Sequence, residues 1–203
     1  MNKSEKIKKL YNACYEGYDE HMTQTGHYIA QEKVLNLMID QISEPILDLA
    51  CGTGFLIKLL SRKFSKIFGN DFSLEMAKIA RRNSKLIITN DNAETLSSYN
   101  QKFKTIICCN LFFYLQDRER AIGRWKELLD SDGKIILIEE FPFIKPKGDE
   151  MSEHSKELMN LIDVTPLEDI GKLLSQNKFH LIKKIKIKID EKHNLHGLVF
   201  SSG

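Results

Sequence analysis

The sequence is poor in cysteine and has no long apolar segment. Its four cysteines are scattered without a CxxC pair, and two of them, Cys108 and Cys109, are neighbours in an apolar run. This usage favours inert thiols in a reducing compartment, so we expect a cytoplasmic protein. The longest apolar stretch, 106–115, is interrupted by Asn110 and is too short to cross a bilayer.

The sequence also has little net charge. It contains 30 Lys and Arg against 28 Asp and Glu, a net charge of +2, which indicates neither a nucleic acid nor an anionic membrane as partner. The segment 1–18 is amphipathic rather than continuously apolar, so it is not typical of a signal peptide. With 42% hydrophobic and 29% charged residues, the composition predicts one soluble domain with a sizeable core.

Strand and helix patterns alternate from residue 46 onward. Apolar runs predict strands over 46–50, 66–71, 85–89, 104–109 and 134–140. Helical periodicity predicts helices over 55–62, 74–83 and 118–129. Ser73 and Asp117 can cap the last two helices, and a DSDG turn, 130–133, precedes the fifth strand. Because the strands are nearly all apolar, we expect a parallel sheet covered on both faces by helices.

The two ends of the chain have other patterns. At the N-terminus, apolar residues at helical spacing run to Tyr18, a polar turn follows over 19–27, and a second helix carries Ile29 to Ile42. Near the C-terminus, 165–168 is a capping box that opens a helix. Isoleucines and lysines then alternate over 179–190, which we expect to pair with 194–202 as an edge hairpin, the lysines preventing aggregation.

Two glycines, Gly52 and Gly54, stand where the first strand passes into a helix. Ligands bind beyond the carboxyl ends of parallel strands, and a glycine there lets backbone N–H groups approach a ligand. A dinucleotide fingerprint would have a third glycine at Ile57. Asp48 precedes the glycines and Asp71 ends the neighbouring strand, where a carboxylate can accept the two hydrogen bonds of a ribose diol.

The ordered motifs of residues 46–141 resemble those of the class I S-adenosylmethionine-dependent methyltransferases, especially the type 11 or UbiE-like branch that acts on small molecules. DLACGTG is similar to the first motif of that family, GNDFSLEMAKIA to the second, TNDNAETL to GDAExLP, and LLDSDGKIILIEE to LKPGGxLxIxE. The resemblance implies a Rossmann-like α/β fold with seven strands in the order 3-2-1-4-5-7-6, the last strand antiparallel. It also implies S-adenosylmethionine as cofactor and a small-molecule substrate, with the protein a monomer or homodimer.

The resemblance also implies roles for single residues. Asp48 and the loop of Ala50, Cys51, Gly52, Thr53 and Gly54 would hold the methionine part of the cofactor. Asp71 would bind the ribose and Phe72 would lie against the adenine. Asn92 and Ala93 would meet the adenine edge, although Asp91 could take that contact instead because the family has Gly-Asp where Asp91-Asn92 stands. Asn110 would lie near the sulfonium, and Tyr18 would belong to an N-terminal segment that covers the cofactor.

The catalytic group stays open at this level. If the acceptor must lose a proton, a His, Tyr or carboxylate within reach is needed, and the candidates are His21, His27, Tyr18, Tyr114, Glu139 and Glu140. Phe112, Phe113 and Tyr114 are core residues or part of a substrate wall. His193 and His196 have the spacing of a metal pair, but we expect solvated histidines of a hairpin turn and no metal site.

We expect one domain of four parts. Residues 1–43 would form an N-terminal helical cap, 44–141 the cofactor-binding core, 142–164 an insertion that acts as a substrate lid, and 165–203 the final helix and hairpin. Two other functions compete with methyl transfer. One is a module that binds S-adenosylmethionine without chemistry, and the other is an NAD(P)-dependent oxidoreductase, which the missing third glycine disfavours.

Overall fold

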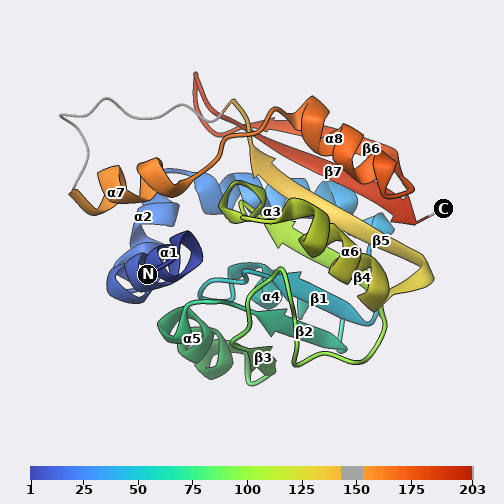
Figure 1. Ribbon diagram of the computed structural model, residues 1–203, viewed down its shortest axis with the longest axis horizontal. Helices are drawn as coiled ribbons and strands as arrows, with labels where there is room; N and C mark the ends of the chain where they lie inside the picture. The colour runs from blue at the N-terminus through green and yellow to red at the C-terminus, as the bar shows by residue number, and fades with distance from the viewer. Residues whose placement is uncertain (143–152, 203) are drawn as a thin grey trace.

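A computed structural model of the chain, which describes residues 1–142 and 153–202, shows one mixed sheet between layers of helices (Figure 1). The strands follow the order β3-β2-β1-β4-β5-β7-β6. β1 to β5 are parallel to one another, and β7 runs antiparallel to both β5 and β6. The predicted fold class and strand order are therefore confirmed. The strands are β1 Ile46–Leu49, β2 Ile67–Asn70, β3 Ile87–Thr89, β4 Phe103–Cys109, β5 Leu129–Glu140, β6 Phe179–Lys188 and β7 Asn194–Ser202.

Helices cover both faces of this sheet and one of its ends. They are α1 Lys3–Cys14, α2 Tyr18–Gln24, α3 His27–Met38, α4 Phe55–Leu60, α5 Leu74–Ser84, α6 Arg118–Leu128, α7 Glu153–Leu161 and α8 Leu167–Gln176, with short 3-10 turns η1 Ile39–Gln41 and η2 Phe112–Tyr114. Ser73 and Asp117 cap α5 and α6 through their side chains, as the sequence predicts. No helix among these elements is both long and apolar enough to span a membrane.

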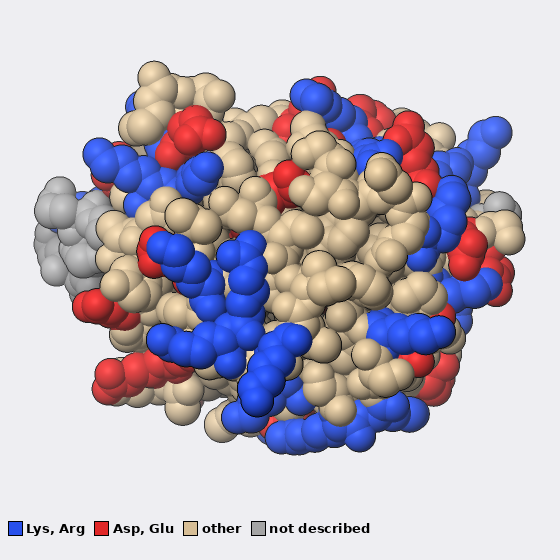
Figure 2. Space-filling view, turned by 90° about the horizontal axis from the view of Figure 1, so that it is seen from below, with Lys and Arg blue, Asp and Glu red and all other residues tan. Residues whose placement is uncertain are grey.

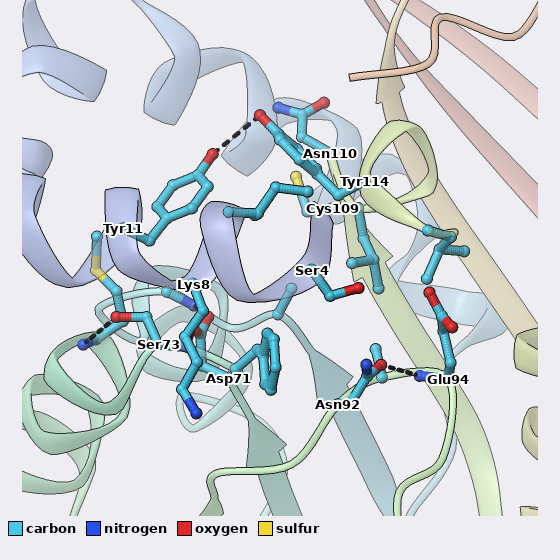
Figure 3. A pocket seen from close by; sticks show the side chains of 18 of the residues that line it. Ser4, Lys8, Tyr11, Asp71, Ser73, Asn92, Glu94, Cys109, Asn110 and Tyr114 are labelled. Carbon is cyan, nitrogen blue, oxygen red and sulfur yellow. Dashed lines mark hydrogen bonds between the residues drawn. The ribbon is translucent and has the colours of Figure 1, made fainter. Parts of the chain in front are cut away.

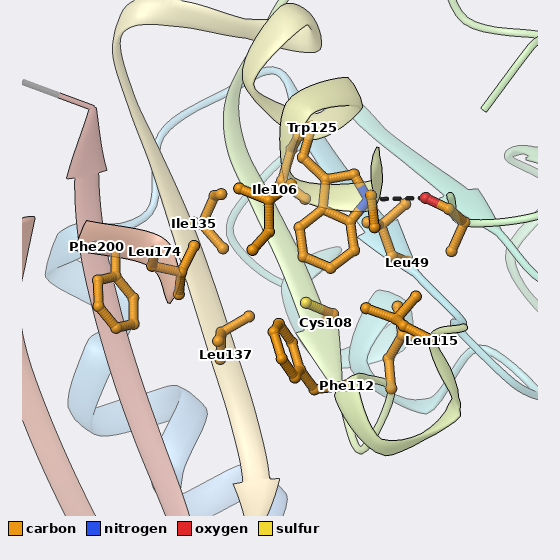
Figure 4. Close-up of a cluster of buried hydrophobic side chains, with 14 of the residues drawn as sticks. Leu49, Ile106, Cys108, Phe112, Leu115, Trp125, Ile135, Leu137, Leu174 and Phe200 are labelled. Carbon is orange, nitrogen blue, oxygen red and sulfur yellow. Dashed lines mark hydrogen bonds between the residues drawn. The ribbon is translucent and has the colours of Figure 1, made fainter. Parts of the chain in front are cut away.

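Alternate residues of the central strands feed two separate apolar clusters. On one face, Leu49, Ile106 and Ile135 pack against α6 and α8 around the fully buried Trp125, as Figure 4 shows. The indole N–H of Trp125 donates to the carbonyl of Ala93 at 2.8 Å. On the other face, strand residues pack against α3, α4 and α5. Two-sided burial explains why the strand sequences are apolar throughout.

The C-terminal hairpin forms as predicted. β6 stands at the edge of the sheet, where Ile185, Ile187 and Ile189 contact the second cluster. The intervening lysines leave that edge charged, which disfavours pairing with another chain. The helix before the hairpin is predicted correctly but its capping box does not form, because the residue that caps α8 is Pro166 and no side chain bonds to its first turn.

The N-terminal region differs from its prediction. The first helix ends at Cys14, and Gly17, with φ of 79°, turns the chain before α2 begins at Tyr18. The segment predicted as a polar turn is therefore mostly the helix α2, followed by a second left-handed glycine, Gly26, with φ of 77°. α3 packs against β6 and β7 as a layer helix, so of the three N-terminal helices it is α1 and α2 that lie over the end of the sheet (Figure 1).

Two further differences concern the C-terminal half. Residues 130–133, predicted as a turn, belong to β5, whose pairing with β4 shifts register between Phe103 and Thr105. This irregularity lets the chain pass directly from α6 into the sheet. The predicted insertion 142–164 lies partly outside the described residues, and its described part includes α7, which lies beside α1.

Candidate functional site

A cavity opens at the carboxyl ends of β1, β2 and β4, beneath α1. Its volume is about 820 Å³, the space open to solvent included. A smaller cavity of about 390 Å³ adjoins it toward α3. Both are lined by Tyr18, Ala50, Gly52, Cys109 and Asn110. Figure 3 shows side chains from α1, the β2–α5 turn and the loops after β3 and β4 converging on the larger one. This is the crevice at which ligands bind to open parallel sheets.

The glycine loop forms the floor between the two cavities. Gly52 and Gly54 have φ of 56° and 91°, values that a residue with a side chain rarely adopts. A Cβ on Gly54 would lie 3.4 Å from Cα of Ala80, so this glycine also lets α5 approach. A Cβ on Gly52 would lie 3.8 Å from the ring of Tyr18. Gly52 therefore presents backbone without a side chain to both cavities, which gives a reason for a glycine at this position after β1.

The loop also contains Ala50, Cys51 and Thr53. Ala50 is left-handed, with φ of 52°. The backbone N–H of Cys51 donates to Asn70 at 2.9 Å, and burial raises the pKa of its thiol well above the ordinary value. Thr53 is buried and lines the smaller cavity. Of the predicted loop, Ala50 to Thr53 therefore border the cavities with Cys51 as an inert thiol, whereas Gly54 lines neither cavity.

Asp71 is fixed to the glycine loop by backbone hydrogen bonds. Its Oδ2 accepts from the N–H of Gly52 and its Oδ1 from that of Ser73, both at 2.8 Å. Burial raises the pKa of this carboxyl to about 6, although the two N–H donors act in the opposite direction. Each oxygen keeps a second lone pair, and the side chain lines the larger cavity. Asp71 is thus a preorganised acceptor at the predicted position.

Asp48 presents a different kind of carboxyl group. It is 1% exposed, and neither of its oxygens has a hydrogen-bond partner among the described residues. Burial, and to a smaller extent the charge of Asp71, raises its pKa well above the ordinary value. It lines the smaller cavity together with Tyr28 and Gln31. An unpartnered buried carboxyl is costly unless a ligand supplies donors or positive charge.

The two residues after β3 that are predicted as alternatives for the adenine contact face in different directions. The carboxylate of Asp91 accepts from Ser97 Oγ at 3.0 Å and from the N–H of Ser98 at 2.8 Å, and it does not line the cavity. Asn92 and Ala93 do line it. Oδ1 of Asn92 accepts the N–H of Glu94 at 2.8 Å (Figure 3). The side chain of Asn92 therefore faces the cavity and that of Asp91 faces away.

Phe72 lines the opposite side of the larger cavity, under α1. The ammonium of Lys8 lies 4.7 Å from the centroid of its ring. Asn12 fixes α1 nearby, since its Oδ1 accepts from the hydroxyl of Ser73 at 2.7 Å. The larger cavity is also lined by the α1 residues Ser4, Ile7, Lys8 and Tyr11. Sequence reasoning missed these four residues, although the apolar face of α1 was a signal for contact with the core.

Three tyrosines stand where the two cavities meet. The hydroxyl of Tyr11 donates to that of Tyr114 at 2.9 Å, and the rings of Tyr11 and Tyr18 meet edge to face with centroids 6.4 Å apart. Burial raises the pKa of Tyr114 to about 12 and the pKa values of Tyr11 and Tyr18 well above their ordinary range. All three are neutral phenols at pH 7. Tyr114 is thus a wall residue, whereas its neighbours Phe112 and Phe113 are core.

Asn110 is held at the same junction by its own backbone. It has a φ of 50°, its N–H donates to Ile138 at 2.8 Å, and its Oδ1 accepts the N–H of Glu140 at 3.0 Å. Asparagine tolerates this left-handed conformation better than most residues. Asn110 therefore lines both cavities.

The remaining catalytic candidates lie outside both cavities. His21 is exposed on α2. His27 bonds through Nε2 to Glu140 at 3.1 Å and through Nδ1 to the hydroxyl of Thr25 at 2.8 Å. Glu139 is fully buried, with its Oε1 accepting from two backbone N–H groups. Of the candidates named from sequence, the structure brings only Tyr18 and Tyr114 to the cavities.

The two C-terminal histidines are separated in the structure. His193 is in the turn and bonds to Asp190 at 2.6 Å, as a partly exposed turn histidine can. His196 is not a solvated turn residue, because it lies inside β7 and is only 7% exposed. Among the residues that the structure describes, no group of three His, Cys, Asp or Glu is placed to hold a metal ion.

Asp19 joins the cap to the glycine loop, a role that the sequence did not reveal. Its Oδ1 accepts from the hydroxyls of Tyr28 and Thr53, each at 2.5 Å. Tyr28 in turn stacks on Phe55, with ring centroids 3.8 Å apart. The resemblance placed Tyr18 in a segment that covers the cofactor, but only the fold shows that the next residue, Asp19, reaches the loop while Tyr18 borders the cavities.

Comparison with known sequences gives an independent result. Residues 46–133 match a family model described as a methyltransferase domain. A demethylmenaquinone methyltransferase of Thermotoga maritima is 32% identical over 116 residues, which cover 55% of this chain and 50% of that protein. An uncharacterized methyltransferase of Anoxybacillus flavithermus is 27% identical over 63% of this chain and 60% of its own length. The chain thus spans less than two thirds of these two relatives.

Longer similarity is weaker in identity but covers nearly the whole chain. The ubiquinone/menaquinone biosynthesis C-methyltransferase UbiE of Wigglesworthia glossinidia brevipalpis is 25% identical over 94% of this chain and 80% of its own length. The magnesium protoporphyrin IX methyltransferase of Synechocystis PCC 6803, solved with S-adenosylmethionine bound, superposes with a TM-score of 0.74 at 16% identity, covering 100% of this chain and 98% of that one. The fold, the motifs and these matches support a relationship to the class I S-adenosylmethionine-dependent methyltransferases, with the family model matching residues 46–133.

Proposed function

We propose that this protein transfers a methyl group from S-adenosylmethionine to a small-molecule acceptor. The observation that carries the proposal is the junction of Asp71 with Gly52, where a ribose acceptor and exposed backbone meet at the floor of a large cavity. The similarity of the chain to quinone methyltransferases and to a porphyrin methyltransferase supports an acceptor of small-molecule class.

The residues present fit the cofactor in chemical type. The unpartnered carboxyl of Asp48 suits the ammonium group of the methionine part. Gly52 would give that part room next to Tyr18, and Asp71 would accept from the ribose hydroxyls. Phe72, Asn92 and Ala93 line the region that suits the adenine, so we assign the adenine edge to Asn92 and not to Asp91.

Methyl transfer from a sulfonium depends mainly on alignment of the reacting groups and exclusion of water. When bound, the cofactor supplies a methyl group on a positively charged sulfur, which is already a good leaving group. The protein holds the reaction partners in line and excludes water. Asn110 and the neutral phenols of Tyr11, Tyr18 and Tyr114 border the place where this has to happen. No general base is assigned, because His21 and His27 lie outside the cavities.

The cap is proposed as the lid of this site. α1 lies over the larger cavity, and Asp19 ties α2 to the glycine loop. The left-handed glycines Gly17 and Gly26 bound α2 on either side. α7 lies beside α1, so the described part of the predicted insertion, from residue 153 on, adjoins this lid. We limit the N-terminal lid to residues 3–24, since α3 belongs to the sheet layers.

We further propose that the protein works in the cytoplasm as a monomer or homodimer, without a nucleic acid or membrane partner. The mixed charge of its surface supports this. On the face drawn in Figure 2, groups of Lys and Arg are separated mainly by uncharged residues, Asp and Glu lie mostly toward the margins, and no single sign covers the face. A surface of this kind lacks the broad basic field that nucleic-acid binding uses.

Calorimetry and a turnover assay test the proposal together. The purified protein should bind S-adenosylmethionine and S-adenosylhomocysteine, and NAD or NADP titrated in the same way should give no heat. Incubation with isotopically labelled cofactor and a metabolite extract should yield S-adenosylhomocysteine and a labelled product. Binding without turnover in any extract fraction would favour the non-catalytic module, and binding of nicotinamide nucleotides alone would favour the oxidoreductase.

A further inference from the structure

Glu139 and His196 occupy paired strand positions at the end of the sheet, and neither lines a cavity. In the antiparallel ladder of β5 and β7, Glu139 is the direct partner of His196. Such partners project from the same face of a sheet with Cβ atoms about 5 Å apart. Glu139 is 0% exposed and His196 is 7% exposed. Two titratable side chains therefore share a buried surface, and the proposed methyl transfer uses neither of them.

Each of these side chains has one bonded end and one free end. Glu139 Oε1 accepts from the backbone N–H groups of Leu111 and Phe112 at 3.2 and 3.1 Å. His196 Nε2 bonds to the carbonyl of Phe141 at 3.0 Å. Within the described part of the chain, Glu139 Oε2 and His196 Nδ1 have no hydrogen-bond partner. Buried polar atoms almost always have a hydrogen-bond partner, so we looked for one partner that could serve both Glu139 Oε2 and His196 Nδ1.

The bond to Phe141 fixes the tautomer of a neutral His196 ring. A carbonyl can only accept, so Nε2 of His196 carries a hydrogen, and Nδ1 of the neutral ring is then an acceptor. A carboxylate oxygen would repel that lone pair, whereas a carboxylic acid would complement it. One water molecule could accept a hydrogen bond from the acid O–H of Glu139 and donate one to Nδ1, which would give both atoms a hydrogen-bond partner.

The electrostatic surroundings agree with this assignment. Burial raises the pKa of Glu139 to about 8, against the opposing effect of the two loop N–H groups. Burial also lowers the pKa of His196, and Lys184 and Lys186 on β6 lower it further, while the bond to Phe141 acts in the other direction. The raised pKa of Glu139 favours its carboxylic acid form near pH 7, and the lowered pKa of His196 favours its neutral ring.

The pair is attached to the loop that borders the active site. Besides the two bonds to Glu139, the N–H of Asn110 donates to Ile138 and the side chain of Asn110 accepts from Glu140. Four hydrogen bonds thus tie residues 110–112 to the end of β5. Asn110 and Tyr114, which line the larger cavity, stand on this loop. A displacement of Glu139 would therefore shift Asn110 and Tyr114 at the wall of the larger cavity.

We propose that Glu139, as a carboxylic acid, and His196, as a neutral imidazole, form one water-bridged unit that positions the 110–114 loop beside the methyl-transfer site. Glu139 is a positioning residue in this unit, since it acts through Asn110 and Tyr114 and does not line either cavity. The consequence for methyl transfer rests on the proposed function, whereas the protonation and the loop bonds do not.

Two variants of similar volume separate the roles of Glu139. In Glu139→Gln, the amide oxygen can still accept from Leu111 and Phe112 and the amide N–H₂ can replace the acid proton. Glu139→Leu can do neither. Amide hydrogen exchange at Leu111 and Phe112 should be within about twofold of wild type in the Gln variant and roughly tenfold or more faster in the Leu variant. Equal exchange in all three proteins, or equally fast exchange in both variants, would overturn the proposal.

Nitrogen NMR of His196 tests the protonation without any ligand. The ring should remain the neutral tautomer with hydrogen on Nε2 from about pH 6 to pH 8 in wild type and in Glu139→Gln. A ring that titrates like an exposed histidine, or one with its hydrogen on Nδ1, would contradict the unit. Should Glu139→Leu fail to fold, His196→Phe removes the acceptor instead and should speed exchange at Phe112 by about threefold.

Binding of S-adenosylhomocysteine then tests the functional consequence. The affinity should fall roughly tenfold in Glu139→Leu and stay within about twofold in Glu139→Gln. Unchanged affinity in a folded Leu variant whose loop exchange has increased would refute the positioning role. If wild type itself does not bind S-adenosylhomocysteine, the proposed function fails, while the NMR and exchange results still decide whether the unit exists.

Discussion

The two walls of the larger cavity are built from different kinds of contact. The sheet wall consists of loops that follow β1, β2, β3 and β4, and it is fixed by backbone bonds to Asp71 and by the fully buried Trp125. The cap wall consists of α1 and α2. Its hydrogen bonds to the sheet side run through single side chains, those of Asn12, Asp19 and Tyr11 among them.

This difference predicts two separate stabilities within one domain. The cap buries only Ile7, Leu10 and Met22, each at 8% exposure, whereas many sheet residues are at 0%. Local opening is favoured where few apolar side chains are buried and hydrogen bonds are exposed. The sheet wall should therefore stay rigid while the cap opens to admit ligands, and substitutions in the two walls should have different signatures.

The largest effect is expected at the floor of the sheet wall. Gly52→Val places a branched side chain at φ of 56° and toward Tyr18, so the loop must distort and the ligand's place is filled. Calorimetry should show S-adenosylhomocysteine affinity reduced by more than about 100-fold. Gly123→Ala on α6, where a Cβ would meet nothing within 4 Å, is the matched control and should bind like wild type. Near-equal affinity of the two variants would show that the floor does not contact the ligand.

A smaller loss is expected at the acceptor for the ribose. Asp71→Ala removes a charged hydrogen-bond partner, which costs about 1.5–3 kcal/mol, or roughly ten- to 100-fold in affinity. Asp91→Asn changes a neighbouring carboxylate that faces away from the cavity, so it should leave the affinity nearly unchanged. Circular dichroism would establish that both variants fold. If Asp91→Asn weakened binding more than Asp71→Ala, the adenosine part of the cofactor would have to bind on the side of the loop after β3 that Asp91 faces.

The same contrast explains how far the sequence could be interpreted. Three of the site features can be located from local sequence: Asp48, the glycine loop and Asp71. Each lies within or next to the end of an apolar run that predicts a strand. Their places beside the cavities follow from the motif order and the parallel topology. Strand order and the edge position of β6 could be predicted for the same reason, because apolar periodicity and the family motifs agree.

The cap could not be predicted in this way, because its structure depends on contacts made after the chain folds. α2 is a short polar helix with one buried residue, Met22, and nothing in its periodicity distinguishes it from a turn. Asp19 acts by reaching Thr53, 34 positions away in the chain. His196 looked like a turn histidine because the spacing to His193 is short, yet the strand begins at Asn194 and carries His196 into the sheet.

A moderate effect is expected where the walls are joined. Asp19→Ala removes the acceptor shared by Tyr28 and Thr53, so the cap should open more often while the sheet stays folded. We expect a three- to tenfold loss of S-adenosylhomocysteine affinity, about 1 kcal/mol, and faster hydrogen exchange over residues 18–24. Glu20→Ala, next to it on the exposed face of α2 and bonded only to Gln24, is the control. If exchange over α2 is the same in both variants and in wild type, Asp19 does not hold the lid.

The smallest effect is expected from the exposed charge on the cap wall. Lys8→Met keeps the length of the side chain but removes the ammonium that lies 4.7 Å from the ring of Phe72. Partly exposed cation–π contacts contribute about 0.5–1 kcal/mol, so S-adenosylhomocysteine affinity should fall about two- to fivefold. Because salt screens exposed charges, the difference should shrink when calorimetry is repeated at about 1 M salt. Lys9→Met changes an exposed neighbour on α1 and should have no effect at either salt concentration. A loss for Lys8→Met that persists at high salt would mean that the ammonium acts through a short-range contact shielded from salt, and the cap wall would then resemble the sheet wall more closely than its hydrogen bonds suggest.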